Sequence, residues 1–564
     1  MKPAERLKLL LGKGYFQSEL PPVFVTDTFA SNVEYILSEW NSKKLFEVAS
    51  VNYKRPGKAK LRLASSYKYK IVGTEAEIIS KPKRGFERRN IQLTHPLPQA
   101  LLAKEISDNW ETICRWLSSA TYSVDRLEFT ANSGRGISDI NFRAHEAKKS
   151  FIEATADWLV LTDITRFYPT IYTHSIPWAA YGKARVKADL SRYAGSLGDR
   201  IDALLRSCNR DQTVGIPIGP ETSRIVAEII STRLDQHLYE RQRLNQNRAD
   251  RLQDDWFVGA DDLAEAERVL STLHQVYREY GLEINGSKTS IDRVVSSHAA
   301  TWKTELSGFL SHRNGPIQGT RLREFFDLSV RLQVSYKNDP VINYALAVLE
   351  RDKYQDDDLA SIEIFLLKAA QLSPISVDKI ARIIINIFSA NQRLSLSRIA
   401  QRFTALAERH LENGNTFEAI WLIYALRGTK RNLNSKVIGD LCVDQAGSVL
   451  PLILLDMKSK GLFSRKLPNA HWENSFLPDR VNEDWCWLLA YEGIRHGWLA
   501  DKHGLMGKSL FKPLADRAVV FYDETKNIAR SRKEIRNRAV KSRNQASAVV
   551  ALLKKWRGFS DDNY

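Results

Sequence analysis

The feature that constrains this chain most is a pair of adjacent carboxylates, Asp254 and Asp255, between two short apolar or extended runs. Asp tolerates the backbone geometry of a tight turn, and the Phe257-Val258 dipeptide after the pair favours a strand. Residues 251–258 therefore predict a hairpin with both carboxylates at its turn. Paired carboxylates on a turn are most often only solvated, so the pair indicates a site only if other acidic residues join it.

A second acidic position lies upstream, at Asp163. It ends an apolar run, residues 159–162, that predicts a buried strand, and the aromatic pair Phe167-Tyr168 follows it. Carboxylates from two strands that converge on one point can hold two Mg²⁺ ions, and Mn²⁺ can replace them. Such ions activate a 3′ hydroxyl and stabilise a leaving pyrophosphate. The two acidic positions together therefore favour nucleotidyl transfer.

These carboxylates belong to a longer pattern that resembles the palm of reverse transcriptases. Residues 163–168, Asp-x-x-x-Phe-Tyr, are similar to motif A, and residues 215–220 with Ser223 are similar to motif B. Residues 252–255, Leu-Gln-Asp-Asp, stand where these enzymes carry the Tyr-x-Asp-Asp of motif C. The order and spacing of the motifs fit the family across about residues 50–315.

The fourth motif and two departures complete the resemblance. Residues 281–285 with Lys288 are similar to motif D. Leu252 departs from the family because the usual Tyr is missing, and Ile218 replaces a common Gln. Both departures concern template and primer handling more than metal binding.

The form of motif B and residues 167–176 are most similar to the bacterial abortive-infection reverse transcriptases. The resemblance implies an α+β fold, with right-hand polymerase fingers and palm followed by an all-α HEAT-like repeat domain in place of the usual thumb. It divides the chain into N-terminal helices and fingers (1–150), a palm (151–318) and a helical repeat domain with a basic C-terminal helix (319–564). It also implies antiphage defence and a homo-oligomer, trimeric or hexameric.

The resemblance assigns roles to single residues, and residue chemistry leaves a plainer alternative for each. Tyr168 would exclude a 2′ hydroxyl from the nucleotide, or it is an aromatic of the core below the site. Lys288 would donate a proton to the leaving pyrophosphate or neutralise it, or it is a solvated surface lysine. The implied metal ligands are Asp163, Asp254, Asp255 and the carbonyl of Ile164.

Two further groups are candidate substrate contacts. Arg88 and Arg89 end a basic stretch and would bind a triphosphate, because Arg offers a bidentate fork to phosphate. The alternative is an exposed basic hairpin. Gly215 and Gly219, around Pro217, would let the backbone approach a base pair closely, although a plain loop before a helix has the same composition.

Composition agrees with a nucleic-acid partner without deciding it. The formal net charge is +17 over 564 residues, and hydrophobic residues make up 43%, which indicates a folded protein. No long apolar span or lipidation motif is visible, so nucleic acid is a better anionic partner than a membrane surface. The four cysteines are scattered without metal-like pairs, as expected for buried thiols in a reducing cytoplasm.

Periodicity predicts the other elements. Thr28 to Trp40 and residues 99–118 predict helices, 51–63 predicts two strands joined by a Pro-Gly turn, and 119–150 is rich in loops. Asp261-Asp262 indicates the N-terminus of a helix over 263–280. The resemblance, rather than periodicity, implies that Trp302 to Leu310 forms the primer-grip hairpin. The remaining predicted helices cover 359–370, 377–388, 396–411, 417–426, the stretch from 484 to 498, and a basic helix at 526–543.

The sequence thus predicts a DNA polymerase of the reverse transcriptase type that uses dNTPs. The missing Tyr at 252 and Gln at 218 favour untemplated, protein-primed synthesis, with the DNA product attached to the protein. Copying of an RNA, such as a noncoding RNA, is the alternative within this class. A non-catalytic nucleic-acid-binding scaffold is the alternative from another class. A group II intron maturase-like protein is a third option without support, because no zinc-finger or His-Asn-His nuclease signature follows the palm. The candidate priming residues are exposed tyrosines near the chain ends: Tyr564, Tyr35 and Tyr15.

Overall fold

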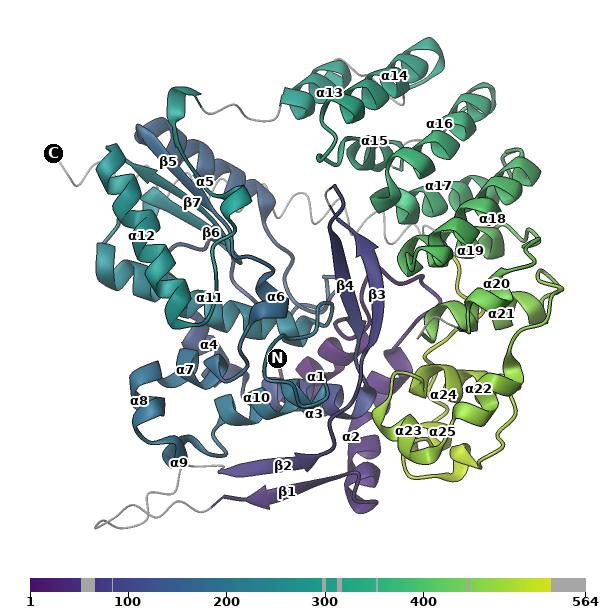
Figure 1. The fold of residues 1–564 in the computed structure, drawn as a ribbon, viewed down its shortest axis with the longest axis horizontal. Helices are drawn as coiled ribbons and strands as arrows, with labels where there is room; N and C mark the ends of the chain where they lie inside the picture. Colours follow the sequence, from purple (N-terminus) through teal and green to yellow (C-terminus); the bar gives the residue numbers. More distant parts are fainter. Residues whose placement is uncertain are drawn as a thin grey trace.

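The chain folds as a mixed α/β molecule in the computed structural model, which describes residues 1–51, 66–83, 85–296, 301–311, 317–350, 354–443 and 447–528. Figure 1 shows a sheet and its packed helices on one side of the molecule and an arc of helices on the other side. This helical arc consists of the described helices within residues 301–516, and a long hairpin lies between it and the sheet. The predicted combination of helices and sheets is therefore confirmed. The predicted strand pair at 51–63 and basic helix at 526–543 lie outside the described residues, apart from their first residues.

The sheet that carries the acidic residues has four antiparallel strands in the order β6-β7-β5-β8. Its strands alternate their side chains between two faces. Leu159 and Phe257 pack on Ile152 of the covering helix α5, whereas Val160 and Val258 face the large core shared with α11 and α12. The strands are β5 (Trp158–Thr162), β6 (Ala249–Leu252), β7 (Asp255–Ala260) and β8 (Ser290–Arg293), and the helices are α5 (Phe142–Thr155), α11 (Glu221–Gln242) and α12 (Leu263–Glu279).

The N-terminal part combines helices with two hairpins. The predicted helix at 28–40 is confirmed, and the predicted helix at 99–118 is broken in two at Asn109. The last part of the predicted loop region, from residue 142 to 150, is helical instead and belongs to α5. The elements are α1 (Pro3–Gly12), α2 (Asp27–Ser42), α3 (Pro96–Asp108), α4 (Trp110–Leu117), β1 (Phe46–Ser50) paired with β2 (Tyr67–Ile71), and β3 (Glu77–Pro82) paired with β4 (Arg88–Leu93).

Short helices connect β5 to α11. The first of them follows Asp163 and carries the predicted aromatic pair. They are α6 (Phe167–Thr170), α7 (Ser175–Tyr181), α8 (Lys183–Ala188), α9 (Leu190–Tyr193) and α10 (Leu197–Ser207).

The second half of the described chain is helical. The four predicted helices between 359 and 426 are confirmed, as is a helix within 484–498, and Trp487 lies in the core. The predicted hairpin at 302–310 is wrong: these residues form α13, because Trp302 and Leu306 are buried at helical spacing. The helices are α13 (Thr301–Ser311), α14 (Gly319–Ser335), α15 (Val341–Leu349), α16 (Leu359–Leu372), α17 (Val377–Ser389), α18 (Leu396–Glu412), α19 (Thr416–Gly428), α20 (Ile438–Leu441), α21 (Val449–Ser459), α22 (Asn469–Ser475), α23 (Pro478–Glu483), α24 (Trp487–Arg495) and α25 (Lys512–Asp516).

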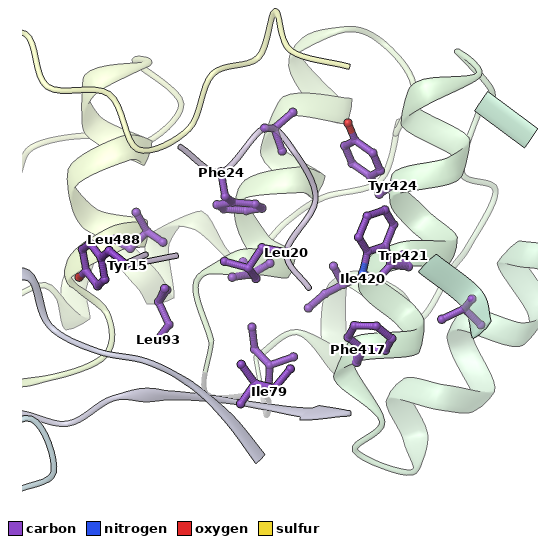
Figure 2. Packing of buried hydrophobic residues seen from close by; sticks show 14 of the residues in the cluster. Tyr15, Leu20, Phe24, Ile79, Leu93, Phe417, Ile420, Trp421, Tyr424 and Leu488 are labelled. Carbon is purple, nitrogen blue, oxygen red and sulfur yellow. The ribbon is translucent and has the colours of Figure 1, made fainter. Parts of the chain in front are cut away.

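The core does not stop between the sheet-bearing half and the helical half. Figure 2 shows Ile79 of β3 and Leu20 of the N-terminal segment packed beside Phe417, Ile420 and Trp421 of α19. The indole of Trp421 also donates a hydrogen bond to the Glu19 carbonyl at 2.8 Å. The helical arc is therefore built onto the N-terminal segment and the β3–β4 hairpin.

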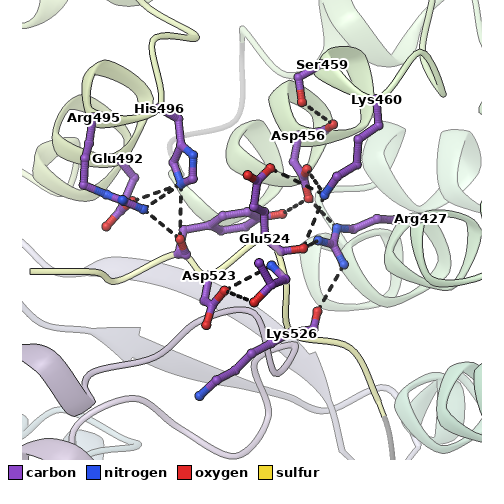
Figure 3. Close-up of polar contacts among 12 residues, drawn as sticks. Arg427, Asp456, Ser459, Lys460, Glu492, Arg495, His496, Asp523, Glu524 and Lys526 are labelled. Atoms are coloured by element: carbon purple, nitrogen blue, oxygen red, sulfur yellow. Dashed lines mark hydrogen bonds and ion pairs between the residues drawn. The ribbon is translucent and has the colours of Figure 1, made fainter.

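A C-terminal segment, residues 519–528, joins the same parts. Its backbone pairs with the N-terminal segment, as Val25 N–H donates to the Phe521 carbonyl at 2.9 Å. The Tyr522 hydroxyl donates to the buried Asp456 carboxylate of α21 at 2.7 Å, and the Arg427 guanidinium of α19 donates to the Glu524 carbonyl at 2.6 Å. Figure 3 shows this network of polar contacts. None of the described helices is long and apolar enough to cross a membrane.

Candidate functional site

The two predicted acidic positions meet at one edge of the sheet. Asp163 directly follows β5, and Asp254 lies in the two-residue turn between β6 and β7. Because β5 and β7 are antiparallel with Thr162 opposite Trp256, one further step of this register places Asp163 opposite Asp255. The predicted hairpin is confirmed, with Asp255 as the first residue of its second strand.

The neighbouring carboxylates influence the ionisation of Asp254. The pKa of Asp254 is raised well above its ordinary value by burial, by a hydrogen bond to Asp163 and by the negative charges of Asp163 and Asp255. Such a cluster favours binding of a proton or of a cation.

Lys288 supplies one positive charge to this cluster. Its ammonium group contacts the Asp163 carboxylate, and the segment before it runs beside the acidic strand end, with Asn285 N–H donating to the Asp163 carbonyl at 2.8 Å. Burial opposes the charged form of Lys288, but the bond to Asp163 and the neighbouring carboxylates raise its pKa above the ordinary value. Ile164 lies next to Asp163, is buried, and bridges to Ile284. Residues 281–285, which resemble motif D, meet the end of β5 through this bridge.

Arg251 supports the turn that carries Asp254, a role that the sequence reasoning missed. Its side chain is fully buried and pairs with Glu228 at 2.7 Å and Asp235 at 3.2 Å, both on α11. It also donates to the Gln253 carbonyl at 3.0 Å. Gln253 has a left-handed φ of 57°, which costs a non-glycine residue conformational energy. The sequence did contain a signal for this role. Glu228 and Asp235 are seven residues apart, so they lie on the same face of α11, where both can pair with an arginine of the neighbouring strand.

The Tyr168 hydroxyl is within reach of the charge of Asp254. The tyrosine ring is partly buried on α6, and the pKa of the hydroxyl is raised by burial and then by the charge of Asp254. The Tyr168 carbonyl accepts a hydrogen bond from Ile216 N–H at 3.0 Å. The predicted loop at 215–220 is therefore held against the segment that follows Asp163.

The same loop is fixed from its other side by two residues that the sequence did not single out, Gln17 and Gln92. Gln92 of β4 exchanges hydrogen bonds with Ile218, as donor from its N–H at 2.9 Å and as acceptor through its side chain at 3.3 Å. The Gln17 amide donates to the Gln92 carbonyl. Gly219 has a φ of 137°, and a side chain there would overlap Gln17. Gly215 has a φ of 91°, and Pro217 lies between the two glycines.

The two candidate triphosphate arginines differ. Arg88 is bound to Glu418 of α19, with 2.9 and 2.7 Å between their nitrogen and oxygen atoms. Arg89 is exposed and has no ion pair or side-chain hydrogen bond to any described residue. The adjacent positions therefore lie in different chemical environments.

The candidate priming tyrosines are not equivalent. Tyr15 is fully buried and its hydroxyl donates to the Thr94 carbonyl at 2.6 Å, so the expectation of an exposed hydroxyl at this position is wrong. The reason is packing: Tyr15 lies against Phe16 and Phe29 in the core. Tyr35 is partly buried, with the Arg517 guanidinium 3.9 Å from its ring centre. Tyr564 lies outside the described residues.

The acidic cluster has the chemistry for magnesium but is not a closed cage. In the described part of the chain, no group of three or more His, Cys, Asp or Glu side chains could hold a metal ion as it stands. Mg²⁺ is usually bound through one or two carboxylates, with waters and substrate phosphates completing its shell. The raised pKa of Asp254 marks an excess of negative charge that a divalent cation would neutralise. Asp163, Asp254 and Asp255 therefore fit a site that a nucleotide completes.

Comparisons with known proteins identify no family. No family model matches the chain, and no curated protein matches it. Among solved structures, the chain is similar to telomerase from Candida albicans in complex with a TWJ fragment of telomeric RNA, at 13% identity and a TM-score of 0.26. That match covers 66% of this chain and 68% of the other. The chemistry of the site is therefore the basis for assigning a function.

Proposed function

We propose that this protein is a DNA polymerase of the reverse transcriptase type that joins deoxynucleotides by nucleotidyl transfer. The observation that supports it most is the meeting of Asp163 with Asp254 and Asp255 at one sheet edge, with Lys288 against Asp163. Two Mg²⁺ ions bound there would stabilise the attacking and leaving oxygens.

The chain's own residues would divide the work. Asp163, Asp254 and Asp255, with the carbonyl of Ile164, would bind the ions. Lys288 would move from Asp163 to the leaving pyrophosphate, because a metal ion on Asp163 removes its ion-pair partner. The lysine would then neutralise charge or donate a proton.

The substrate contacts follow from the surroundings of the cluster. Tyr168 lies near Asp254, so its ring would meet the sugar and exclude a 2′ hydroxyl. The loop with Gly215, Pro217 and Gly219 would approach the base pair. The Arg89 guanidinium, which has no ion pair with any described residue, would bind the triphosphate, whereas Arg88 is already bound to Glu418.

We further propose that synthesis is untemplated, starts on a protein tyrosine and serves antiphage defence. Leu252 and Ile218, in place of the Tyr and Gln of templated relatives, support this choice over copying of an RNA. Tyr564 and Tyr35 are the remaining candidates for the priming residue. Protein incubated with labelled dNTPs and denatured should keep its label until treated with DNase or protease, whereas label that separates on denaturation contradicts protein priming.

The decisive experiment measures incorporation of radiolabelled dNTPs by the purified protein with Mg²⁺. The wild-type protein should incorporate label, and Asp163→Asn should lose all of it while unfolding at the wild-type temperature. Asp261→Asn is the matched control, because Asp261 belongs to the other acidic pair and binds Arg248 at the surface. Asp262 of that pair caps α12, as predicted.

A non-catalytic nucleic-acid-binding scaffold is the second candidate. The ion pair between Lys288 and Asp163 favours it, since a lysine that permanently neutralises Asp163 would replace the metal. A scaffold would bind nucleic acid but incorporate nothing with either Mg²⁺ or Mn²⁺. Incorporation that depends on Asp163 would exclude this candidate.

A further inference from the structure

The β3–β4 hairpin is held at its outer edge by the first turn of α19. Ser80 N–H of β3 donates to the Thr416 hydroxyl at 3.2 Å, and the Lys81 ammonium lies 5.3 Å from the centre of the Phe417 ring. Ile79 packs into the same helix face, as Figure 2 shows. The helical arc therefore supports the hairpin through polar, cation–π and apolar contacts.

Arg88 is the strongest of these links. Its Nη1 and Nη2 atoms donate to the two oxygens of Glu418 at 2.9 and 2.7 Å, and its Nε and Nη2 atoms donate to the Ser80 side chain and carbonyl, both at 2.6 Å. All three guanidinium nitrogens are thus engaged. The Glu418 side chain is only 1% exposed. A buried carboxylate is costly without its partner, so Arg88 cannot leave Glu418 freely for a substrate.

The other end of β4 contacts the candidate site. Gln92, four residues after Arg88, exchanges two hydrogen bonds with Ile218, and Ile216 of the same loop donates to the Tyr168 carbonyl. Tyr168 lies near Asp254. A continuous set of contacts therefore runs from Glu418 through Arg88 and β4 to Tyr168, whose hydroxyl is within reach of the charge of Asp254.

We infer that Glu418 of the helical arc is a positioning residue for the nucleotide site. It holds Arg88 and thereby fixes β4 and the loop beside the carboxylates, while Arg89 remains the hairpin arginine that meets the triphosphate. This inference rests on the proposed function. It gives the helical arc a part in nucleotide binding, because a displacement of α19 would move β4 and lower affinity for the nucleotide.

The test compares KM and kcat for a dNTP in four single variants and two double variants. Glu418→Gln and Arg88→Met should each raise KM about fivefold with kcat within twofold of wild type. The double variant should be no worse than either single one, because two residues that act through one contact are not additive. Arg89→Met is the matched control: it should also raise KM, and its effect should multiply with that of Glu418→Gln. Arg88→Lys should raise KM less than Arg88→Met, because lysine keeps the positive charge beside Glu418 and the position is partly exposed.

Two outcomes overturn the inference. One is a KM for Glu418→Gln within twofold of wild type in a protein that unfolds at the wild-type temperature. The other is multiplication of the Glu418→Gln and Arg88→Met effects. Equilibrium binding of a fluorescent dGTP analogue distinguishes failure of this inference from failure of the proposed function. A wild-type protein that incorporates nothing refutes the polymerase, and the same pattern in Kd would still support Glu418 as a positioning residue. Absence of dGTP binding by the wild type would refute both.

Discussion

At the scale of single residues, the carboxylates of Asp163, Asp254 and Asp255 repel one another at the site where we propose nucleotidyl transfer. Asp254 is held between Asp163 and Asp255, and the raised pKa of its carboxyl records the energy of that arrangement. Active sites commonly keep such unfavourable groups because function requires them. The cluster should therefore reduce stability in the absence of cations.

We predict that Asp254→Asn abolishes incorporation without lowering the free energy of unfolding. The pKa of Asp254 is raised in the folded state, so its contribution to stability is complete below its ordinary pKa of about 3.9 and is lost as pH rises through the folded-state value. The variant should become progressively more stable than wild type as pH rises above about 4 in metal-free buffer. Denaturant titrations over pH measure this; equal pH profiles would contradict it.

Tyr168 gives a second prediction at this scale. Tyr168→Ala should raise the use of ribonucleotides relative to deoxynucleotides about tenfold, because the ring beside Asp254 would no longer fill the space that a 2′ hydroxyl needs. Single-nucleotide incorporation measures the ratio. Tyr172→Ala is the control, since Tyr172 packs on His174 and Trp178 instead. A ratio unchanged in Tyr168→Ala would make Tyr168 a core residue.

At the scale of elements, the loop between α10 and α11 is fixed by residues from two distant segments. Gln17 and Gln92 hold its C-terminal half, and the backbone of residues 168–171 holds its N-terminal half. The loop is thus rigid where the proposed function places a base pair. Gly219 of this loop is required for two reasons, its left-handed backbone and its close approach to Gln17, and a substitution with a matched control can separate them.

We predict that Gly219→Ala destabilises the protein by about 3 kcal/mol, since a left-handed backbone and an overlap with Gln17 act together. Gly414→Ala is the matched control: Gly414 has a φ of 67°, and an added Cβ there would meet no atom within 4 Å. The control should cost only about 1 kcal/mol. Chemical denaturation provides both values, and equal costs would show that Gln17 does not constrain Gly219. Incorporation should fall in Gly219→Ala alone.

At the scale of the whole molecule, buried polar residues connect the β3–β4 hairpin, the N-terminal segment and the helical arc. Glu77 of β3 is one of them: its carboxylate is buried and accepts a hydrogen bond from Val449 N–H, at the start of α21, at 3.2 Å. Its second oxygen has no hydrogen-bond partner among the described residues. Burial raises its pKa to about 7, although hydrogen bonds from Ser448 and Val449 oppose the rise.

We predict that the contact between Glu77 and α21 weakens as pH rises from about 4 to about 7. The folded-state pKa of Glu77 lies above the ordinary Glu value of about 4.3, so its stabilising contribution is complete below that value and is lost as pH rises through about 7. The free energy of unfolding should fall by about 3 kcal/mol at most between pH 4 and 8 on this account. Glu77→Gln should remove that part of the fall, whereas Glu47→Gln, at an exposed position of β1, should not. A variant profile parallel to wild type would contradict the prediction.

Local sequence was sufficient for the elements that carry the candidate site. A turn-forming Asp pair before a β-branched and aromatic run specifies the β6–β7 hairpin, and the apolar run before Asp163 specifies β5. Helical periodicity likewise identified the helices between 359 and 426, because spacing alone marks a face to be buried. The hairpin expected at Trp302 to Leu310 came from the resemblance to reverse transcriptases and was wrong, because the buried residues there have a helical spacing.

Only the tertiary structure decided which partners these residues meet. Arg88 and Glu418 are 330 positions apart. The sequence does not distinguish Arg88 from Arg89, but packing binds Arg88 to Glu418 and gives Arg89 no ion pair within the described part of the chain. Tyr15 could serve as an exposed hydroxyl by its position near the chain end, yet the aromatic core takes it in. Local propensity acts over a few residues, whereas burial and ion pairing depend on how distant elements come together. The sequence by itself therefore determined the acidic cluster, and the packing determined what surrounds it.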